Sequence, residues 1–131
     1  MLKAIAAFTL DSFDQDPPYY KDGDASYARA RIAKTFTGDI TGTSTAEMLS
    51  VRVGDDGAGY VALERIVATI GGRSGSFALL HIGTMQGSET WAKWPVVPNS
   101  GSGGLAGLTG EGRIEIAPDG AHTFILAYEL P

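Results

Sequence analysis

A carboxylate that faces an imidazole inside a protein can move protons, because histidine titrates near neutral pH and a carboxylate can orient its ring. Glu64 and His81 are the residues of this sequence that could form such a catalytic pair. Glu64 and its neighbour Arg65 lie in the apolar run 60–70, and His81 lies in a second apolar run, 76–82. An unpaired charge in an apolar interior is costly, so these three residues require an explanation.

The two apolar runs predict a β-hairpin, because a glycine-containing segment, 71–75, separates two stretches rich in Val, Ile and Leu. Successive side chains of a strand point to opposite faces, so we expect one of Glu64 and Arg65 to point into the fold. The register of the turn then decides whether His81 stands beside Glu64 or beside Arg65. The sequence leaves both arrangements open.

Each of these residues also has a structural interpretation. The inward one of Glu64 and Arg65 can be satisfied by a polar neighbour and fix the strand register, or Glu64 can be exposed at a bulge. A single histidine on an apolar strand is more often a hydrogen-bonded core residue than a catalytic one. The functional interpretation is that burial shifts the pKa of an inward Glu64, which then acts as a general base or anchors a ligand.

Other residues extend the candidate site. Glu47 is the next candidate interior carboxylate, because the alternating face of 43–53 on which it lies is otherwise rich in Leu, Val and Thr. Trp91 could line the mouth of a pocket or an oligomer interface. The full set of candidate ligand-binding residues is Glu47, Tyr60, Glu64, Arg65, His81, Trp91, His122 and Tyr128.

No metal or cofactor is expected. His81, His122 and a glutamate could in principle bind a metal, but their spacing matches no known metal signature. The segment 101–106 fits a dinucleotide-binding pattern, yet the glycines that follow it preclude the helix on which that pattern depends. We therefore interpret this segment as a turn.

Composition limits the classes of function. The chain has 131 residues, of which 44% are hydrophobic and 19% charged, as expected for one globular domain spanning 1–131. Its net charge of −5 disfavours binding to nucleic acid and to anionic membrane surfaces. Cysteine is absent, which excludes disulfides and thiolate chemistry. We interpret residues 2–10 as a strand rather than a signal peptide and expect a cytoplasmic protein.

The alternation of apolar runs and turn residues predicts an all-β fold with little or no helix. The 18 glycines suit many tight turns, and 11–24 is expected to be an acidic loop because it contains Pro17, Pro18 and Gly23. Seven or eight short strands at this spacing indicate an antiparallel sandwich or barrel. The expected strands lie at 4–10, 28–36, 43–53, 60–70, 76–82, 90–97, 109–116 and 122–129.

Several separated blocks carry a family resemblance. They are ARA at 28–30, KTFTGDITG at 34–42, GYVALER at 59–65, 72–81, VVPNSGSG at 96–103, LAGLTG at 105–110, HTF at 122–124 and YEL at 128–130. In these blocks the chain resembles a bacterial family of unknown function whose members form a small β-barrel similar to plant allene oxide cyclase and related to dirigent-type barrels. The resemblance implies a single antiparallel barrel of about eight strands, with an interior able to hold a small, largely apolar molecule. It implies no catalytic residue, because the functional positions of allene oxide cyclase do not match this sequence residue by residue.

The favoured hypothesis is a barrel that binds a small apolar or amphipathic molecule in its interior, with Glu64, Arg65 and His81 as polar anchors. The alternative is a cyclase- or isomerase-like enzyme in which Glu64 or Glu47 moves a proton and His81 or Arg65 stabilises developing charge. A second alternative is a non-catalytic structural or protein-interaction module, which would also allow a homo-oligomer. The aromatic residues expected at such an interface are Tyr19, Tyr20, Trp91 and Trp94.

Overall fold

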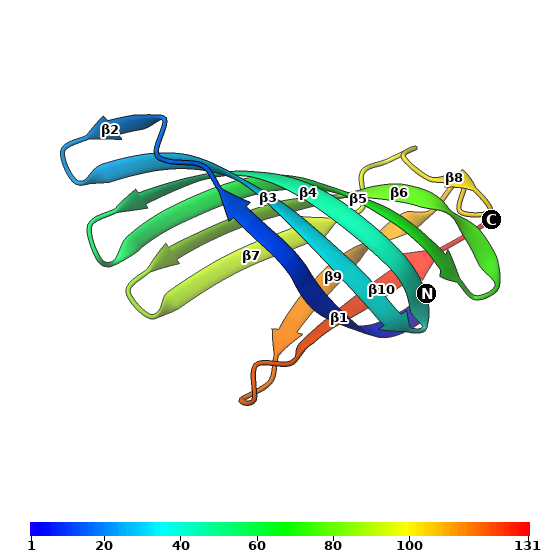
Figure 1. Cartoon of the computed structure of the whole chain (residues 1–131). Helices are drawn as coiled ribbons and strands as arrows, with labels where there is room; N and C mark the ends of the chain where they lie inside the picture. Colours follow the sequence, from blue (N-terminus) through cyan, green and yellow to red (C-terminus); the bar gives the residue numbers. More distant parts are fainter.

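The computed structural model describes all 131 residues and consists of ten β-strands joined by turns and loops, with no helix (Figure 1). The strands are β1 (Leu2–Gln15), β2 (Tyr20–Asp22), β3 (Ala25–Gly38), β4 (Ile40–Val53), β5 (Gly57–Ile70), β6 (Arg73–Gln86), β7 (Glu89–Pro95), β8 (Ser102–Gly103), β9 (Thr109–Ile116) and β10 (His122–Glu129). The prediction of an all-β protein with little or no helix is therefore confirmed.

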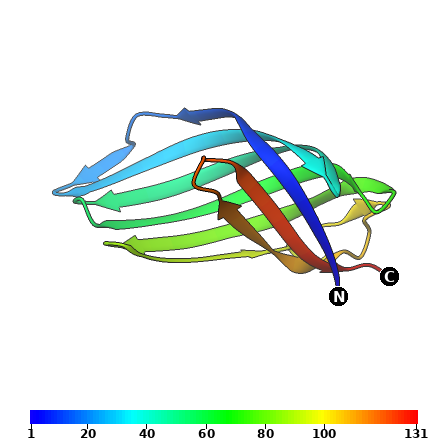
Figure 2. The same ribbon diagram turned by 90° about the horizontal axis from the view of Figure 1, so that it is seen from below.

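Eight of the strands close into an antiparallel barrel. Neighbouring strands follow the order β1-β10-β9-β7-β6-β5-β4-β3, and a further pairing between β1 and β3 closes the ring. The two short strands lie outside this ring, because β2 pairs with β3 and β8 pairs with β6. Figure 2 shows β1 and the β9–β10 hairpin crossing over strands β3 to β7, which form the opposite wall.

Tight turns keep the long strands in register. Gly71 and Gly72 join β5 to β6 with φ angles of 58° and 80°, the conformation of a two-residue hairpin turn that glycine adopts without steric cost. This turn places Ile70 opposite Arg73 and Ala62 opposite His81. Along the second half of β5 the side chains alternate strictly between buried and exposed. The buried set, which includes Glu64, faces the interior of the barrel.

The two ends of the barrel differ. At one end the loop between β8 and β9 inserts Leu105 and Leu108, both 0% exposed, against inward residues such as Phe77 and Leu126. At the other end β7 and β9 pair only at Trp94–Gly112 and Pro95–Glu111 and then separate. Inward residues near this separation, including Tyr60, are only half-buried. The barrel therefore has a closed end filled by apolar side chains and an open end with a more accessible interior.

The N-terminal region differs from the sequence-based expectation. Strand β1 continues to Gln15 rather than ending at Leu10, through an irregularity in its pairing with β3 between Leu10 and Ser12. Strand β2 lies within the segment that was expected to be a loop. Both extensions are stabilised by pairing with the long strand β3, which a local reading of prolines and acidic residues does not reveal. Since the chain forms no helix, it contains none that could cross a membrane.

Candidate functional site

Glu64 lies at the centre of a polar cluster in the barrel interior. Its side chain is 1% exposed. One carboxylate oxygen, Oε1, lies 2.6 Å from Nε2 of His81 and 3.2 Å from Nζ of Lys34. The other oxygen, Oε2, accepts a hydrogen bond from the hydroxyl of Ser44. Both oxygens of the buried carboxylate are thus hydrogen-bonded, as a charge in an apolar interior requires.

The cluster is assembled from four adjacent strands. Lys34 on β3 lies directly opposite Ser44 on β4, Glu64 projects from β5, and His81 projects from β6. On one side of Glu64 and of His81 the directly opposite residue is small, since Ala46 faces Glu64 across β4 and β5 and Ala62 faces His81 across β5 and β6. These alanines leave space in which the polar side chains can converge.

Electrostatics keep Glu64 ionised. Burial raises the pKa of the Glu64 carboxyl, but the hydrogen bond from His81, the positive charge of Lys34 and the hydrogen bond from Ser44 together outweigh it and hold that pKa below its usual value of 4.5. The ammonium of Lys34 also lies 4.8 Å from the ring centroid of Phe8, a favourable cation–π contact. At neutral pH the interior therefore holds a paired carboxylate and ammonium.

The ionised carboxylate fixes the orientation of His81. Nε2 faces Glu64 and donates its hydrogen to Oε1, so in the neutral ring Nδ1 carries the free lone pair. Nδ1 makes no hydrogen bond within the chain. It is not among the fully buried side-chain atoms that lack a partner, because Nε1 of Trp94 is the one atom of that kind. Nδ1 of His81 is therefore not fully enclosed, although the His81 side chain is only 8% exposed. The result is an oriented, largely buried imidazole whose second nitrogen has no partner within the chain.

Two aromatic residues lie beside His81 on the interior surface. The ring of Tyr60 covers Gly83, where an added Cβ would lie 2.3 Å from a ring carbon. Burial raises the pKa of the Tyr60 hydroxyl, and the neighbouring indole of Trp94 partly offsets this increase. Nε1 of Trp94 forms no hydrogen bond of ordinary geometry. A side chain at residue 83 would displace Tyr60, so the glycine permits this arrangement.

Trp94 is placed opposite His81 by the register of the strands. Ile82 pairs with Lys93, and the bridge between Leu79 and Val96 continues the same register. The half-buried Trp94 also packs against the main apolar core. Tyr60 and Trp94 therefore flank the polar cluster on the side of the open end.

The structure settles the orientation that the sequence left open. Glu64 points inward and His81 stands beside it, whereas Arg65 is exposed on the outer face. The hypothesis that Arg65 anchors a ligand inside the barrel is therefore wrong. The reason is the strict alternation of β5, which places adjacent residues on opposite faces.

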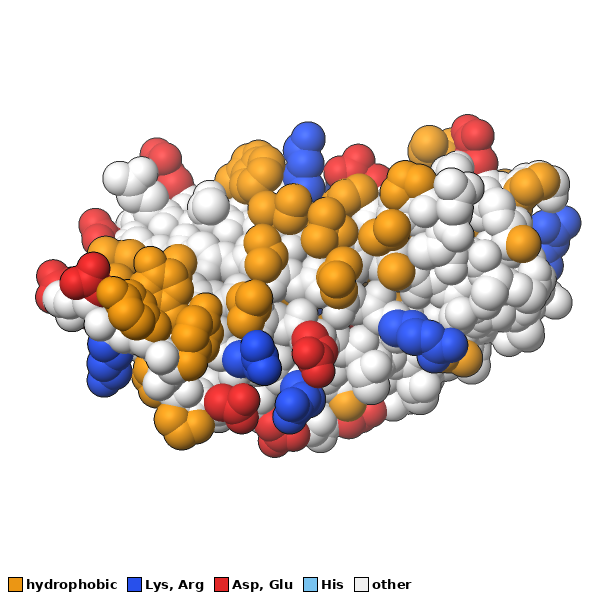
Figure 3. All heavy atoms as spheres, turned by 90° about the horizontal axis from the view of Figure 1, so that it is seen from above, with side chains coloured by type: hydrophobic (Ala, Val, Ile, Leu, Met, Phe, Trp, Pro, Cys, Tyr) orange, Lys and Arg blue, Asp and Glu red, His pale blue; other side chains and the backbone are white.

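The expectation of a second interior carboxylate at Glu47 is also wrong. Glu47 lies on the outer face of β4 and forms an exposed ion pair with Arg31, with Nε and Oε1 3.2 Å apart. The face of β4 that turns inward carries the smaller side chains of Ser44 and Ala46. Leu49, by contrast, is 42% exposed. Figure 3, which views the face opposite to that in Figure 2, shows other apolar side chains gathered across this outer surface.

The remaining candidates are dispersed. Trp91 is 50% exposed on the outer face opposite Thr84, so it does not line the interior. His122 is half-buried, and its ring centroid lies 5.1 Å from that of Phe8. Tyr128 is buried in the main apolar core, with its hydroxyl near the turn at Gly71 at the closed end. Of the predicted interface aromatics, Tyr19 and Tyr20 are exposed, while Trp94 is not.

Lys34 and Ser44 were missed by the sequence reasoning. Lys34 shares the inward face of β3 with Ala28, Ala30 and Phe36, a period-two pattern in which the lysine is the exception. That signal is present in the sequence, but the nearby arginines make the segment resemble a solvent-exposed strand or helix. No group of three or more His, Cys, Asp or Glu side chains is placed to hold a metal ion.

Comparison with known proteins places the chain in a family. The family described as "Protein of unknown function (DUF3224)" matches residues 4–128. The fold is similar to the crystal structure of a DUF3224-family protein of unknown function from Shewanella oneidensis MR-1, with a TM-score of 0.91 and 34% sequence identity, covering 100% of this chain and 98% of that one. No curated protein gives a significant match. The chain therefore belongs to the DUF3224 family of proteins of unknown function.

Proposed function

We propose that the open end of the barrel binds a small amphipathic molecule whose polar head contacts the Glu64 cluster. The observation that carries this proposal is the state of His81, a largely buried side chain that is held by Glu64 through Nε2 and whose Nδ1 has no partner within the chain. Buried polar atoms are normally paired, so an oriented and unpartnered acceptor is a natural contact for a ligand.

The surroundings of the cluster supply the apolar contacts. Four side chains face inward at the open end and are half-buried rather than fully buried: Tyr60, Met48, Trp94 and Ile114. A hydrocarbon chain or ring that covered these side chains would remove apolar surface from water, at about 25 cal/mol per Å². The interior thus combines an apolar wall with one polar floor, the usual composition of a small-molecule site.

Charge balance indicates an uncharged head group. The ammonium of Lys34 already neutralises the carboxylate of Glu64. A ligand carboxylate would add an unpaired negative charge next to Glu64, whereas a hydroxyl can donate a hydrogen bond to Nδ1 of His81 without altering the balance. We therefore favour an alcohol over a carboxylic acid as the ligand head.

Tryptophan fluorescence tests this proposal. In a Trp91→Phe background Trp94 is the only tryptophan, so its emission reports on the open end. We expect decanol to shift this emission saturably and decanoate to do so at higher concentration. Ala62→Leu, which fills the space opposite His81, should abolish the shift, and Ala7→Leu on the outer face of β1 should preserve it. The absence of a saturable shift, or an unchanged response in Ala62→Leu, would exclude the proposal.

Proton transfer is a second candidate function, favoured by the 2.6 Å contact between Glu64 and His81. With Nε2 bound to the ionised carboxylate, Nδ1 can accept a proton from carbon next to a ligand carbonyl, and Glu64 stabilises the imidazolium that forms. Return of that proton to another atom of the resulting enolate gives an isomer and restores the neutral imidazole. The cycle needs no external oxidant or reductant.

Hydrogen exchange tests this second function directly. The protein is incubated with the enolisable ketone 2-decanone in heavy water, and deuterium at the carbons next to the carbonyl is followed by NMR. Catalysis predicts faster exchange than in buffer, lost in His81→Phe and strongly reduced in Glu64→Gln. If exchange is no faster than in buffer while decanol still binds, proton transfer is excluded and the binding function remains.

A further inference from the structure

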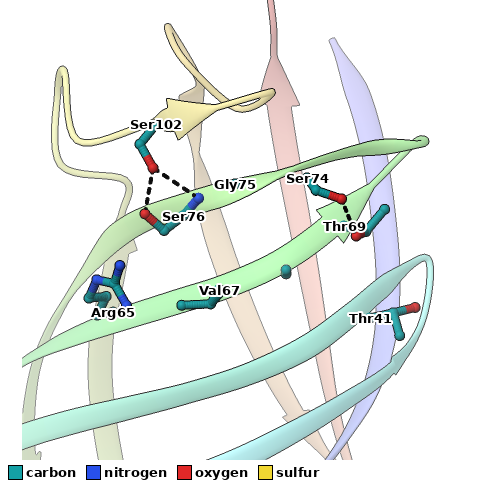
Figure 4. A pocket seen from close by; sticks show the side chains of 9 residues that line it. Thr41, Arg65, Val67, Thr69, Ser74, Gly75, Ser76 and Ser102 are labelled. Atoms are coloured by element: carbon teal, nitrogen blue, oxygen red, sulfur yellow. Dashed lines mark hydrogen bonds between the residues drawn. The ribbon is translucent and has the colours of Figure 1, made fainter.

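The outer face of the barrel carries a second polar site, separate from the interior cluster. A groove of about 480 Å³ lies on β5 and β6 next to the short strand β8, with Thr41 of β4 at its other side (Figure 4). Arg65 is the one charged residue that lines it. A chain with 15 acidic residues thus leaves this groove free of carboxylates.

Arg65 is available to a ligand. The four ion pairs of the protein do not include it. The arginine side chains that donate hydrogen bonds within the chain are Arg31 and Arg73. The guanidinium of Arg65 therefore keeps all five of its N–H donors free.

Hydroxyl groups supply further donors in the groove. Ser76 and Ser102 form one hydroxyl pair and Thr69 and Ser74 form another, each with its oxygens 2.6 Å apart. Only one hydrogen lies between the two oxygens of each pair, so each pair retains one uncommitted O–H. Figure 4 shows that the two pairs come from β5, β6 and β8, so their donors approach from several directions.

Close contact between strands holds this arrangement. At Gly75 an added Cβ would lie 1.9 Å from the carbonyl oxygen of Ser102, so β8 approaches β6 more closely than a side chain would allow. The backbone N–H of Ser76 also donates to the hydroxyl of Ser102. The hydroxyl donors are therefore fixed to the barrel wall rather than carried on a free loop.

We propose that this groove binds the phosphate group of a small phosphorylated molecule. Uncommitted donors, a free guanidinium and the absence of carboxylates match an acceptor-rich anion. A phosphate, with oxygens directed tetrahedrally, can accept from Arg65 and from the nearer hydroxyl pair, Ser76 of β6 and Ser102 of β8, whereas a planar carboxylate uses fewer of these donors. The remaining volume of the groove accommodates the hydroxylated body that carries the phosphate.

Amide NMR titrations test the site with three probes: inorganic phosphate, glycerol phosphate and glycerol. We expect glycerol phosphate to shift the signals of Gly75, Ser76 and Ser102 saturably, inorganic phosphate to do so more weakly, and glycerol to have no effect. Arg65→Met should weaken the binding of glycerol phosphate about tenfold or more, the usual effect of losing a charge-assisted hydrogen bond. The matched control is Arg52→Met, which removes the same charge from another exposed arginine without an ion pair.

Each contrary outcome overturns a defined part of the inference. Equal weakening in Arg52→Met and Arg65→Met would show attraction by overall charge instead of a site. Binding of glycerol as strong as that of glycerol phosphate would show that the groove recognises hydroxyls and not phosphate. No saturable shift with any probe, in protein whose spectrum shows the native fold, would remove the site altogether.

Discussion

Removal of the Lys34 ammonium should cost a large part of the stability of this protein. Lys34 and Glu64 are 8% and 1% exposed, and their charged atoms lie 3.2 Å apart. Lys34→Met keeps the length of the apolar stem but leaves the carboxylate of Glu64 buried without its cation. Breaking a buried ion pair by removal of one partner typically costs about 3–5 kcal/mol.

That loss can be measured by urea unfolding at neutral pH with tryptophan fluorescence as the signal. Domains of this kind have total stabilities of about 5–15 kcal/mol. With a urea dependence of about 1–3 kcal/mol per molar, the unfolding midpoint of Lys34→Met should fall by at least about 1 M. The exposed pair of Arg31 and Glu47 provides the control, because both side chains are more than 60% exposed and loss of either should cost at most about 1 kcal/mol.

A double-mutant cycle separates the pair from the two individual residues. Glu64→Gln and Lys34→Met together should cost less than the sum of the two single changes, by about 0.5–3 kcal/mol, because the double variant leaves no uncompensated charge between them. Additivity within about 0.5 kcal/mol would refute the reasoning, since it would mean that the two side chains do not depend on each other.

The pH dependence of stability tests whether the folded state favours the ionised form of Glu64. The folded-state pKa of Glu64 lies below its usual value of 4.5, so the folded state favours the ionised carboxylate. The stability gained from Glu64 is fully present above that usual value and is lost as the pH falls through the lower, folded-state pKa. The difference in unfolding free energy between the wild type and Glu64→Gln should therefore shrink on acidification below about 4.5. A difference that grows on acidification would contradict the assignment.

Three further predictions concern single residues. Gly75→Ala places a Cβ 1.9 Å from the carbonyl oxygen of Ser102, so NMR should show β8 detached from β6 and unfolding should occur at lower temperature. Gly72 has φ of 80° and no atom within 4 Å of an added Cβ, so Gly72→Ala should cost about 1 kcal/mol through backbone strain alone, and Gly72→Asn less. Burial raises the pKa of Tyr60 above its usual value of 10.0, so absorbance should show a component that ionises above that value, and Tyr60→Phe should remove it.

The barrel itself could be anticipated from the sequence, because alternation and turn residues act locally. The hairpin around Gly71 and Gly72 shows the limit of this reasoning. Five turn-forming residues at 71–75 are compatible with more than one register, and a shift by one residue reverses the face of every following side chain. Only the positive φ angles of Gly71 and Gly72 show that the turn has two residues and that His81 therefore stands beside Glu64.

The error at Glu47 has a physical cause that lies outside its own strand. The sequence reasoning assumed that the more apolar face of a strand is the inner one. In β4 the inner face carries Ser44 and Ala46 instead, since the neighbouring strands fill the space with longer side chains. Leu49 lies outside, 42% exposed. Which face is inner depends on how the strands close into the barrel, and that is a property of the whole chain.

Stability alone does not account for the interior cluster. A buried ion pair is generally no more stabilising than apolar side chains of similar volume, because both charges lose their hydration. At the closed end the barrel is filled in the apolar way, by residues such as Leu105 and Leu108. The charged groups instead lie away from that filled end, beside the half-buried Tyr60 and Trp94, and are themselves buried. A cluster that served only to hold the strands in register would have no need of an imidazole nitrogen without a partner in the chain. Its position between the filled core and the open end is the one that the proposed binding of a small molecule requires.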